Sequence, residues 1–207
     1  MITVENTVLI LLAAGLSRRF GDVGSKLDQE FLGKPLGLHV AVALEEMPFK
    51  ERVAVVDGCR IDYGRYDFRV VHNPQTAEGI ASSIRMGVER ARETDAQAVM
   101  FALADMPRVT ASHIYRMFDV ADSDDCVVAS SDGKEPKPPA IFGRGQFDHL
   151  LTLHGDSGAR ELVAAGRHVV TSPAELIDVD TPGELEELRG LVRSHEAVTR
   201  AAARRSG

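Results

Sequence analysis

The chain has 207 residues, 44% hydrophobic and 27% charged, which is the composition of an ordinary globular protein of one or two domains. Its net charge of −7 argues against broad electrostatic binding to nucleic acid or to an anionic membrane surface. No apolar run approaches the length of a membrane span, and the two cysteines, Cys59 and Cys126, form no C-x-x-C pair. We therefore expect a cytoplasmic protein without nucleic-acid or membrane partners.

Apolar, strand-like runs alternate with helix-like segments along the chain. Strands are predicted at 7–14, 52–57, 68–72, 97–103, 126–130, 138–142 and 168–171. Helices are predicted at 36–47, 79–92, 110–121, 144–153, 157–165 and 182–194. The alternation predicts an α/β fold of three layers, with a mainly parallel central sheet between helices. We expect one domain over 1–194 and a flexible tail over 195–207, where the composition turns to Ala, Arg and Ser.

The stretch 8–26, VLILLAAGLSRRFGDVGSK, joins a buried strand to a basic loop that contains glycine. The loop follows the carboxyl end of the strand, where open α/β sheets bind ligands. Glycine allows the backbone to approach a ligand closely, and Arg19 and Lys26 suit phosphate. The stretch predicts a nucleotide-phosphate site, with a plain core strand and solvated loop as the alternative. A secretory signal is disfavoured because the basic residues follow the apolar run.

A second buried run, AVMFALADMP over 98–107, ends at Asp105 and is stopped by Pro107. A carboxylate at the carboxyl edge of a central strand is well placed to hold Mg²⁺, which takes one or two protein carboxylates together with substrate phosphates. The alternative role is a helix cap, but Thr110 is a better cap for the helix that follows. We interpret Asp105 as a metal ligand.

A third stretch, LIDVDTPGEL over 176–185, is interpreted as a short strand followed by a helix start. Thr181 and Glu184 form a capping-box pattern, which explains both residues structurally. Asp178 and Asp180 have no such explanation, and their period-two spacing on a strand puts both on one face. One of them can serve a metal while the other supports the site, and the residues alone do not separate them.

Two further stretches contain candidate binding residues. In NPQTAEGIASSIRMG, 73–87, a turn and a helix start offer amides and hydroxyls to a base or ribose, although a plain N-capped helix explains the same residues. In the stretch 137–160, which contains KPPAIF and then LTLHGDSGAR, Asp156 is predicted to cap a helix beginning at Ser157. Arg160 then faces an anion on a second substrate.

Together these segments resemble the MobA-like nucleotidyltransferases, and most closely their molybdenum cofactor cytidylyltransferase branch. The resemblance runs from residue 8 to about 188. It rests on LAAGLSRRFG (12–21) with Lys26, GKPL (33–36), N-P…E-G-x-x-S-S…G, L-A-D-M-P, G-D-S-G-A-R and D-V-D-T-P, in the family's order. It implies a Rossmann-like three-layer nucleotidyltransferase fold.

The resemblance also implies roles for individual residues. Arg19, Lys26 and Asp105 would be catalytic, and Asp105 and Asp180 (rather than Asp178) would hold Mg²⁺ or Mn²⁺. The nucleotide-binding set is Leu12, Ala13, Ala14, Gly15, Arg19, Lys26, Asn73, Gly79, Ser82 and Ser83. The acceptor-binding set is Pro139, Asp156, Gly158 and Arg160. Ala14 stands where guanylyl-transferring relatives have glycine, which favours CTP.

This sequence departs from the family pattern in several places. Phe20 replaces a usual Met, the loop from Gly21 to Lys26 is one residue longer, and Ala104 precedes D-M-P where Gly is usual. KPPAIF, 137–142, stands where pterin-specific relatives have a G-H-P-V-F-like segment.

We expect Mg²⁺-dependent transfer of CMP from CTP to a phosphate-bearing acceptor, molybdopterin or the molybdenum cofactor, with release of pyrophosphate. A molybdoenzyme or its chaperone is a further expected partner. The alternative acceptors are a sugar phosphate, a polyol phosphate or another cofactor precursor. A different class of function, a nucleotide- or cofactor-binding chaperone without catalysis, is the third interpretation.

Overall fold

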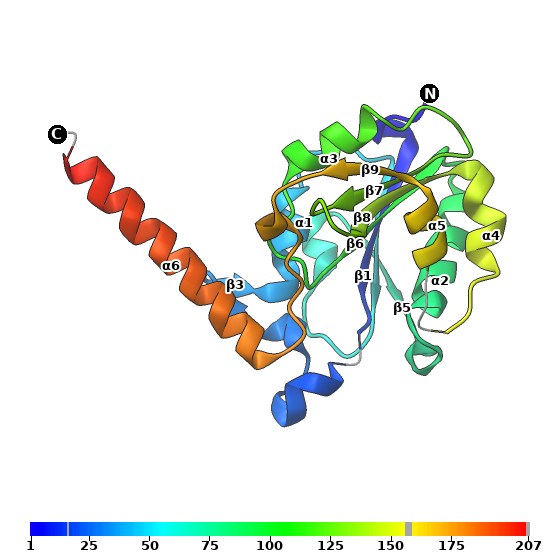
Figure 1. Ribbon diagram of the computed structural model, residues 1–207. Helices are drawn as coiled ribbons and strands as arrows, with labels where there is room; N and C mark the ends of the chain where they lie inside the picture. The colour runs from blue at the N-terminus through cyan, green and yellow to red at the C-terminus, as the bar shows by residue number, and fades with distance from the viewer. Residues whose placement is uncertain (16, 156–158, 206–207) are drawn as a thin grey trace.

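Seven strands form one mixed sheet in the order β5-β4-β1-β6-β8-β7-β9 (Figure 1). The computed structural model describes residues 1–15, 17–155 and 159–205. The strands are β1 (Thr7–Ala13), β4 (Glu51–Val56), β5 (Arg69–His72), β6 (Ala98–Leu103), β7 (Val127–Ser131), β8 (Pro136–Gly143) and β9 (Arg167–Val170). All seven predicted strands are present, and β8 alone runs antiparallel to its neighbours, so the mainly parallel α/β fold is confirmed.

Helices cover both faces of this sheet. They are α1 (His39–Ala43), α2 (Ile80–Glu93), α3 (Ala111–Phe118), α4 (Phe147–Leu151) and α5 (Arg160–Ala165), whereas a sixth helix, α6 (Pro182–Arg205), leads away from the sheet (Figure 1). Leu9 and Leu11 point to the core beneath α1 and α3, whereas Val8 and Ile10 point to the core beneath α2, α4 and α5. The unbroken apolar run of β1 is therefore explained by burial on both faces.

The helices differ from the predicted ranges mainly at their ends. The predictions over 36–47 and 144–153 each become a 3₁₀ turn followed by a short helix, α1 or α4. α6 begins next to a small hairpin, β2 (Glu30–Phe31) and β3 (Lys34–Pro35), and leads away from the sheet to Arg205 (Figure 1). It thus continues through the segment expected as a tail, whose flexibility stays a prediction. Among the described residues, no helix combines the length and apolarity that a bilayer crossing requires.

The segment containing Asp178 and Asp180 is not the short strand that we predicted. A 3₁₀ turn, Pro173–Leu176, leads into a connector that joins no sheet. The Val179 N–H donates to the Asp105 carbonyl at 3.0 Å, beyond the last residue of β6. The ladder has ended at that point, so the segment is held by separate contacts, among them this hydrogen bond and the buried side chain of Val179.

A third small core holds this connector in place. It consists of Phe20, Phe31, Leu36, Val179, Leu185 and Leu188. Apolar residues of the basic loop, the β2–β3 hairpin and α6 therefore pack together, although they are far apart in the sequence. Both the basic loop and the D-T-P segment reach the carboxyl edge of β1 and β6 because of this packing.

Candidate active site

The candidate site lies where the chain connections diverge on the two sides of β1. From β1 the chain continues to β4 and β5 on one side and returns to β6 on the other, which is the topological switch point at which open α/β sheets bind ligands. A cleft of about 420 Å³ opens there. Its lining includes Leu12 and Ala14 after β1, Leu103 and Asp105 after β6, and Asp180.

The basic loop is closed by a hydrogen bond between its two ends. The Lys26 backbone N–H donates to Ser17 Oγ at 3.0 Å, and Ser17 itself has a left-handed backbone with φ of 47°. Ser25 Oγ accepts from the Leu27 N–H and starts a 3₁₀ turn at Lys26, and Leu27 is buried in the core. The stem of Lys26 is thereby held at the cleft, with the residue only 8% exposed.

Lys26 joins the two predicted metal ligands. Its Nζ lies 2.7 Å from Asp105 Oδ2 and 2.7 Å from Asp180 Oδ1, and the other oxygen of Asp180 accepts from Arg19 at 2.7 Å. Asp105 Oδ1 is buried and has no hydrogen-bond partner within the described part of the chain. The four residues therefore form one charge cluster, built from three segments distant in the sequence.

The pKa shifts in this cluster follow from burial and pairing. Burial alone lowers the pKa of Lys26, but the carboxylates of Asp105 and Asp180 outweigh it, so the pKa is raised overall. Burial raises the pKa of the Asp105 carboxyl, and Lys26 offsets part of that rise. The hydrogen bond from Lys26 lowers the pKa of Asp180. Lys26 and Asp180 are therefore both charged at neutral pH.

The donor set of this cluster suits a hard divalent cation. The carboxylates of Asp105 and Asp180 both contact the ammonium group of Lys26, each at 2.7 Å. The second carboxylate oxygen of Asp105, Oδ1, is buried and makes no hydrogen bond within the described part of the chain, so it is available to a metal ion. The described residues contain no group of three or more His, Cys, Asp or Glu side chains that could hold a metal by themselves. A cation bound here would complete its shell with substrate oxygens and water, which is the habit of Mg²⁺.

Most of the predicted nucleotide-binding residues meet at this cleft. Those that line it are Leu12, Ala14, Gly15, Arg19, Lys26, Gly79 and Ser83. Ala13 does not line it, because alternation along β1 turns its side chain into the core. The cleft also has lining residues that the sequence analysis did not single out: Ser17, Leu27, Thr76, Ala77, Ile80 and Leu103. Thr76 and Ala77 lie between Asn73 and Gly79, so the same motif could have revealed them.

Asn73 and Ser82 are buried next to the cleft and form hydrogen bonds that hold its lining in place. Asn73 is fully buried, and its Nδ2 donates to Ser82 Oγ at 2.9 Å and to Ser83 Oγ at 2.8 Å. Its Oδ1 accepts from the Gln75 N–H. Neither Asn73 nor Ser82 lines the cleft; Asn73 instead fixes Ser83, which does.

The amino end of α2 also reaches the cleft. Gly79 occupies the cap position with φ of 87° and provides no side-chain cap, and Gly79, Ile80 and Ser83 all line the cleft. Free amides and the positive end of the helix dipole favour an anion at this point.

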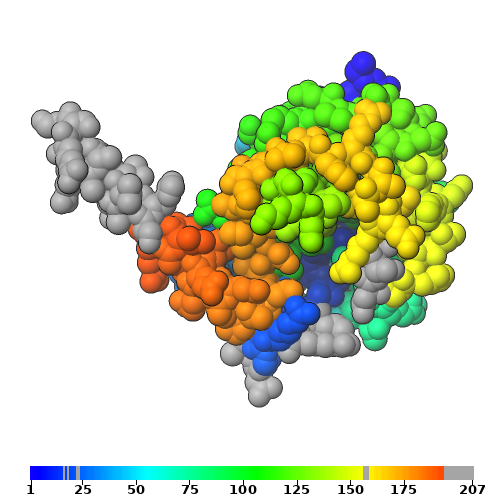
Figure 2. Space-filling view, in the orientation of Figure 1, coloured from blue at the N-terminus to red at the C-terminus, as the bar shows by residue number. Residues whose placement is uncertain are grey.

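A second cavity of about 660 Å³ adjoins the first and shares Leu12, Ile80 and Leu103 with it. Figure 2 shows the surface hollowed between α5 and the segment that precedes α6. The further lining is largely apolar: Ile84, Phe101, Met106, Pro136, Pro138, Ala140, Phe142, Ala159, Val163 and Ala164. Four charged residues, Glu135, Lys137, Arg160 and Asp178, complete it.

Of the predicted acceptor-binding residues that the structure describes, one lines the second cavity and one does not. Arg160 lines the second cavity. Pro139 does not, because it is buried in β8, where its carbonyl accepts from Ser130 Oγ at 2.9 Å. Asp156 and Gly158 lie outside the described residues, as does the predicted helix start at Ser157. Asp178 and Asp180 line different cavities, so they do not act on one face as the strand interpretation implied.

Comparison with known proteins agrees with this geometry. The model of the MobA-like NTP transferase domain matches residues 9–170. The chain belongs to this family. A curated relative, the purine catabolism protein PucB of Bacillus subtilis, is 30% identical over 197 residues, which cover 87% of this chain and 94% of PucB.

Several solved structures have the same fold as this chain. A homologue of Rv0371c from Mycobacterium sp. strain JC1 has a TM-score of 0.78 at 22% identity, covering 93% of this chain and 99% of its own. A nucleotidyl transferase from Methanothermobacter has a TM-score of 0.75 at 18% identity, with 91% and 98% covered. Rv0371c of Mycobacterium tuberculosis, solved as a complex with manganese, has a TM-score of 0.70 at 22% identity, with 89% and 98% covered.

The family-level prediction is therefore confirmed. The protein is a nucleotidyltransferase, and its substrate is a nucleoside triphosphate.

Proposed function

We propose that this nucleotidyltransferase transfers CMP from CTP to the phosphate of molybdopterin or the molybdenum cofactor, and releases pyrophosphate. The observation that carries the proposal is the meeting of Lys26 with Asp105 and Asp180, each at 2.7 Å, beside a second and largely apolar cavity. One cavity suits the triphosphate and the other suits an acceptor with a fused-ring body.

In this proposal the residues of the first cleft position CTP. Lys26, Arg19 and the amino end of α2 bind the phosphates, and Ser83, fixed by Asn73, lies with them. An acceptor phosphate oxygen attacks the α-phosphorus in line, the new P–O bond forms, and the bond to pyrophosphate breaks. Lys26 and Arg19 stabilise the negative charge of the departing pyrophosphate. The acceptor phosphate is already ionised near neutral pH, so no protein base is required.

A divalent cation has a place in this proposal. Asp105 and Asp180 are the residues that hold Mg²⁺ or Mn²⁺, and the ion supplies charge neutralisation of the triphosphate when bound. Rv0371c, which has the same fold, was solved as a complex with manganese, and this supports a divalent cation as part of the proposal.

The choice of base and acceptor rests on two features. Ala14 lines the cleft, and its methyl group narrows the space where guanylyl-transferring relatives have glycine, which favours the smaller pyrimidine of CTP. The apolar lining of the second cavity, including Phe101, Met106 and Phe142, favours a ring system over a sugar or polyol phosphate.

The test is a pyrophosphate-release assay with each of the four NTPs against molybdopterin, the molybdenum cofactor, a sugar phosphate and a polyol phosphate. We expect release with CTP and the pterin acceptors. Release with a different NTP would overturn the choice of base, and release only with the sugar or polyol phosphate would overturn the acceptor. If no pair releases pyrophosphate, nucleotidyl transfer to these acceptors is refuted and a binding role is favoured.

A matched pair of variants tests the metal ligands in the same assay. Asp180→Asn should depress turnover and weaken Mn²⁺ binding, whereas Asp178→Asn, two residues away, should change Mn²⁺ binding much less, because Asp178 lines the other cavity and acts on Asp105 through its charge. Equal effects of the two substitutions on Mn²⁺ binding would contradict the assignment of Asp180.

A further inference from the structure

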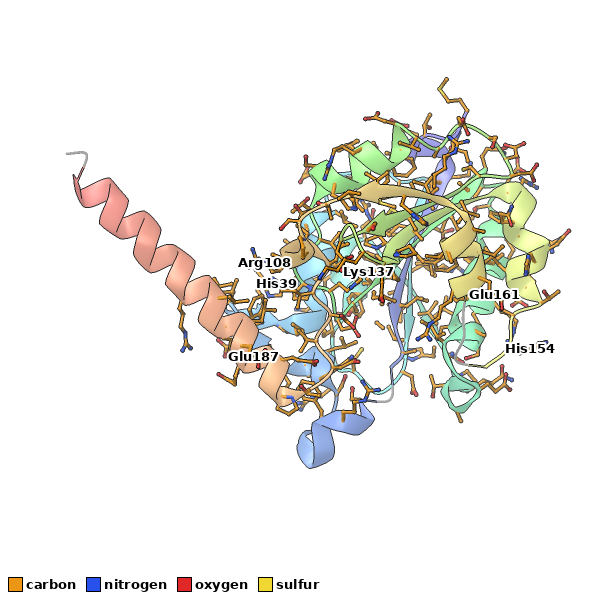
Figure 3. All side chains as sticks on the ribbon, viewed as in Figure 1. His39, Arg108, Lys137, His154, Glu161 and Glu187 are labelled. Atoms are coloured by element: carbon orange, nitrogen blue, oxygen red, sulfur yellow. The ribbon has the colours of Figure 1, made fainter. Side chains whose placement is uncertain are left out.

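One basic residue that lines the second cavity, Lys137, belongs to none of the predicted sites. It lies near the start of β8, and Figure 3 places it toward the centre of the molecule, inside the outer positions of His154 and Glu161. Its side chain is about two-thirds buried and lines the cavity together with apolar residues. Lys137 is the first residue of KPPAIF, the segment that departs from the pterin-specific relatives. The family resemblance therefore gives it no role.

The turn that precedes β8 holds the amine of Lys137. Asp132 Oδ1 accepts from the backbone N–H groups of Lys134 and Glu135 at 2.9 and 3.0 Å. The other oxygen of Asp132 lies 3.4 Å from Lys137 Nζ. Gly133, with φ of 89°, allows the tight turn. One carboxylate thus organises the turn and faces the lysine amine.

Asp132 is ionised at neutral pH. The N–H groups of Glu135 and Lys134 stabilise its ionised form and lower its pKa to about 2. The lysine amine therefore has a fixed negative partner at 3.4 Å, a distance that leaves its other hydrogens for a further acceptor.

A second cation lines the same cavity from a different element. Arg160 begins α5, whereas Lys137 lies in β8. Between these elements the lining is apolar, with Ile84 and Met106 among its residues. Asp178 and Glu135 also line the cavity, so a ligand must place its negative charge near a cation and away from these two carboxylates. Such a cavity fits a molecule with an apolar ring and one anionic group.

We propose that Lys137 binds the anionic group of the acceptor in the second cavity, and that Asp132 positions its amine. The ligand class is a ring compound that carries a phosphate monoester. This inference rests on the proposed function, because it assigns the second cavity to the acceptor. Lys137 thus determines specificity on the acceptor side, and Asp132 is a positioning residue.

The kinetic test compares Lys137→Gln, Lys137→Arg and Asp132→Asn with Lys134→Gln as the matched control. Lys134 is in the same turn, but its side chain is exposed and does not line the cavity. Lys137→Gln should raise the KM for the acceptor about tenfold or more, because a charge-assisted contact is lost. The KM for the NTP should change by less than about twofold, since the NTP cleft is untouched.

The other variants separate contact from positioning. Lys137→Arg keeps the positive charge, so its KM for the acceptor should lie close to that of the wild type. Asp132→Asn keeps an oxygen for the two backbone N–H groups but removes the charge that faces Lys137, so it should raise the acceptor KM by a smaller factor. An unchanged acceptor KM in Lys137→Gln, or an equal rise in Lys134→Gln, would overturn the proposal.

A binding measurement makes the test independent of turnover. Phenyl phosphate, a ring with one phosphate, is titrated into protein with labelled methyl groups, and the signals of Ile84 and Met106 report on the second cavity alone. We expect both signals to shift in the wild type and in Lys134→Gln but not in Lys137→Gln. Shifts that persist in Lys137→Gln, or no shift in the wild type, would overturn the proposal. If the wild type binds phenyl phosphate through Lys137 but releases no pyrophosphate with any acceptor, the proposed function fails, and Lys137 stands only as an anion-binding residue of the second cavity.

Discussion

Replacement of Lys26 by Met isolates the energetics of the charge cluster. The substitution keeps the length and much of the apolar stem of the side chain, but it removes the ammonium that lies 2.7 Å from Asp105 and from Asp180. The Asp105 side chain is only 19% exposed, so water cannot readily replace the lost partner. Asp180 is more than a third exposed, so solvent screens most of its loss.

The expected magnitude comes mainly from Asp105. Loss of one partner of a buried ion pair destabilises a protein by roughly 3–5 kcal/mol. Because the Asp105 carboxyl is not fully buried, we expect Lys26→Met to lower the free energy of unfolding by about 2–4 kcal/mol at pH 8. Lys26→Met/Asp105→Asn should recover most of this loss, since it leaves no unpaired buried charge.

The loss should also depend on pH. Burial raises the pKa of Asp105 above its unfolded value, and the rise is larger once Lys26 no longer offsets it. Between the unfolded and folded pKa values the folded state binds more protons, so the stability of the variant falls as pH rises. The deficit relative to wild type is therefore smaller at pH 5 than at pH 8.

The assay is urea unfolding of wild type, Lys26→Met, the double variant and the exposed control Lys50→Met at both pH values. A deficit below about 0.5 kcal/mol at pH 8, the size of an ordinary surface effect, would refute the reasoning. So would a deficit that is equal at the two pH values, or a double variant as unstable as the single one.

Four other substitutions test further parts of the site and the fold. Asp105→Asn should lower turnover in the pyrophosphate assay by two to three powers of ten at saturating Mg²⁺ and CTP, if it removes ~3–4 kcal/mol of transition-state stabilisation; near-wild-type turnover would contradict the metal assignment. Asn73→Ala removes the acceptor of the Gln75 N–H and the donor to the Ser82 and Ser83 hydroxyls, and it should cost about 1–3 kcal/mol in thermal unfolding, with a higher KM for the NTP. Gly87→Ala should destabilise by roughly 1–3 kcal/mol in urea, because its Cβ would lie 2.6 Å from a side-chain carbon of β1. Gly190→Ala should raise the free energy of unfolding by about 0.5–1 kcal/mol, because the space around its added Cβ is open. If both glycine substitutions changed the free energy of unfolding in the same direction, this explanation would be wrong.

Local pattern was sufficient for the elements whose cause is local. The strands could be predicted because burial on both faces of β1 and β6 leaves an unbroken apolar run. The caps could be predicted because Thr110 accepts from the His113 N–H, and Thr181 and Glu184 bond each other's backbone within one turn. The apolar pattern around Val179 was too short to distinguish a strand from a connector that joins no sheet.

The candidate site shows the same division. Lys26 and Asp105 could be selected as candidates because each belongs to a recognisable motif, whereas Asp180 was preferred to Asp178 only through the family resemblance. The Ala13 side chain lies in the core and Pro139 lies inside β8, so neither lines a cavity, because the direction of a side chain depends on its register in the sheet. Lys137 was missed because its relation to the cavity depends on the turn at Asp132 and on the distant helix α5.

The sequence by itself determined the order of the elements, the parallel sheet and the residue types that nucleotidyl transfer requires, because periodicity and capping act over a few residues. Only the tertiary structure decided that Arg19, Lys26, Asp105 and Asp180 form one cluster and that a second cavity opens beside it. These contacts join positions up to 161 residues apart, through a small core shared by the basic loop, the hairpin and α6. Their geometry depends on long-range packing, which no local pattern encodes.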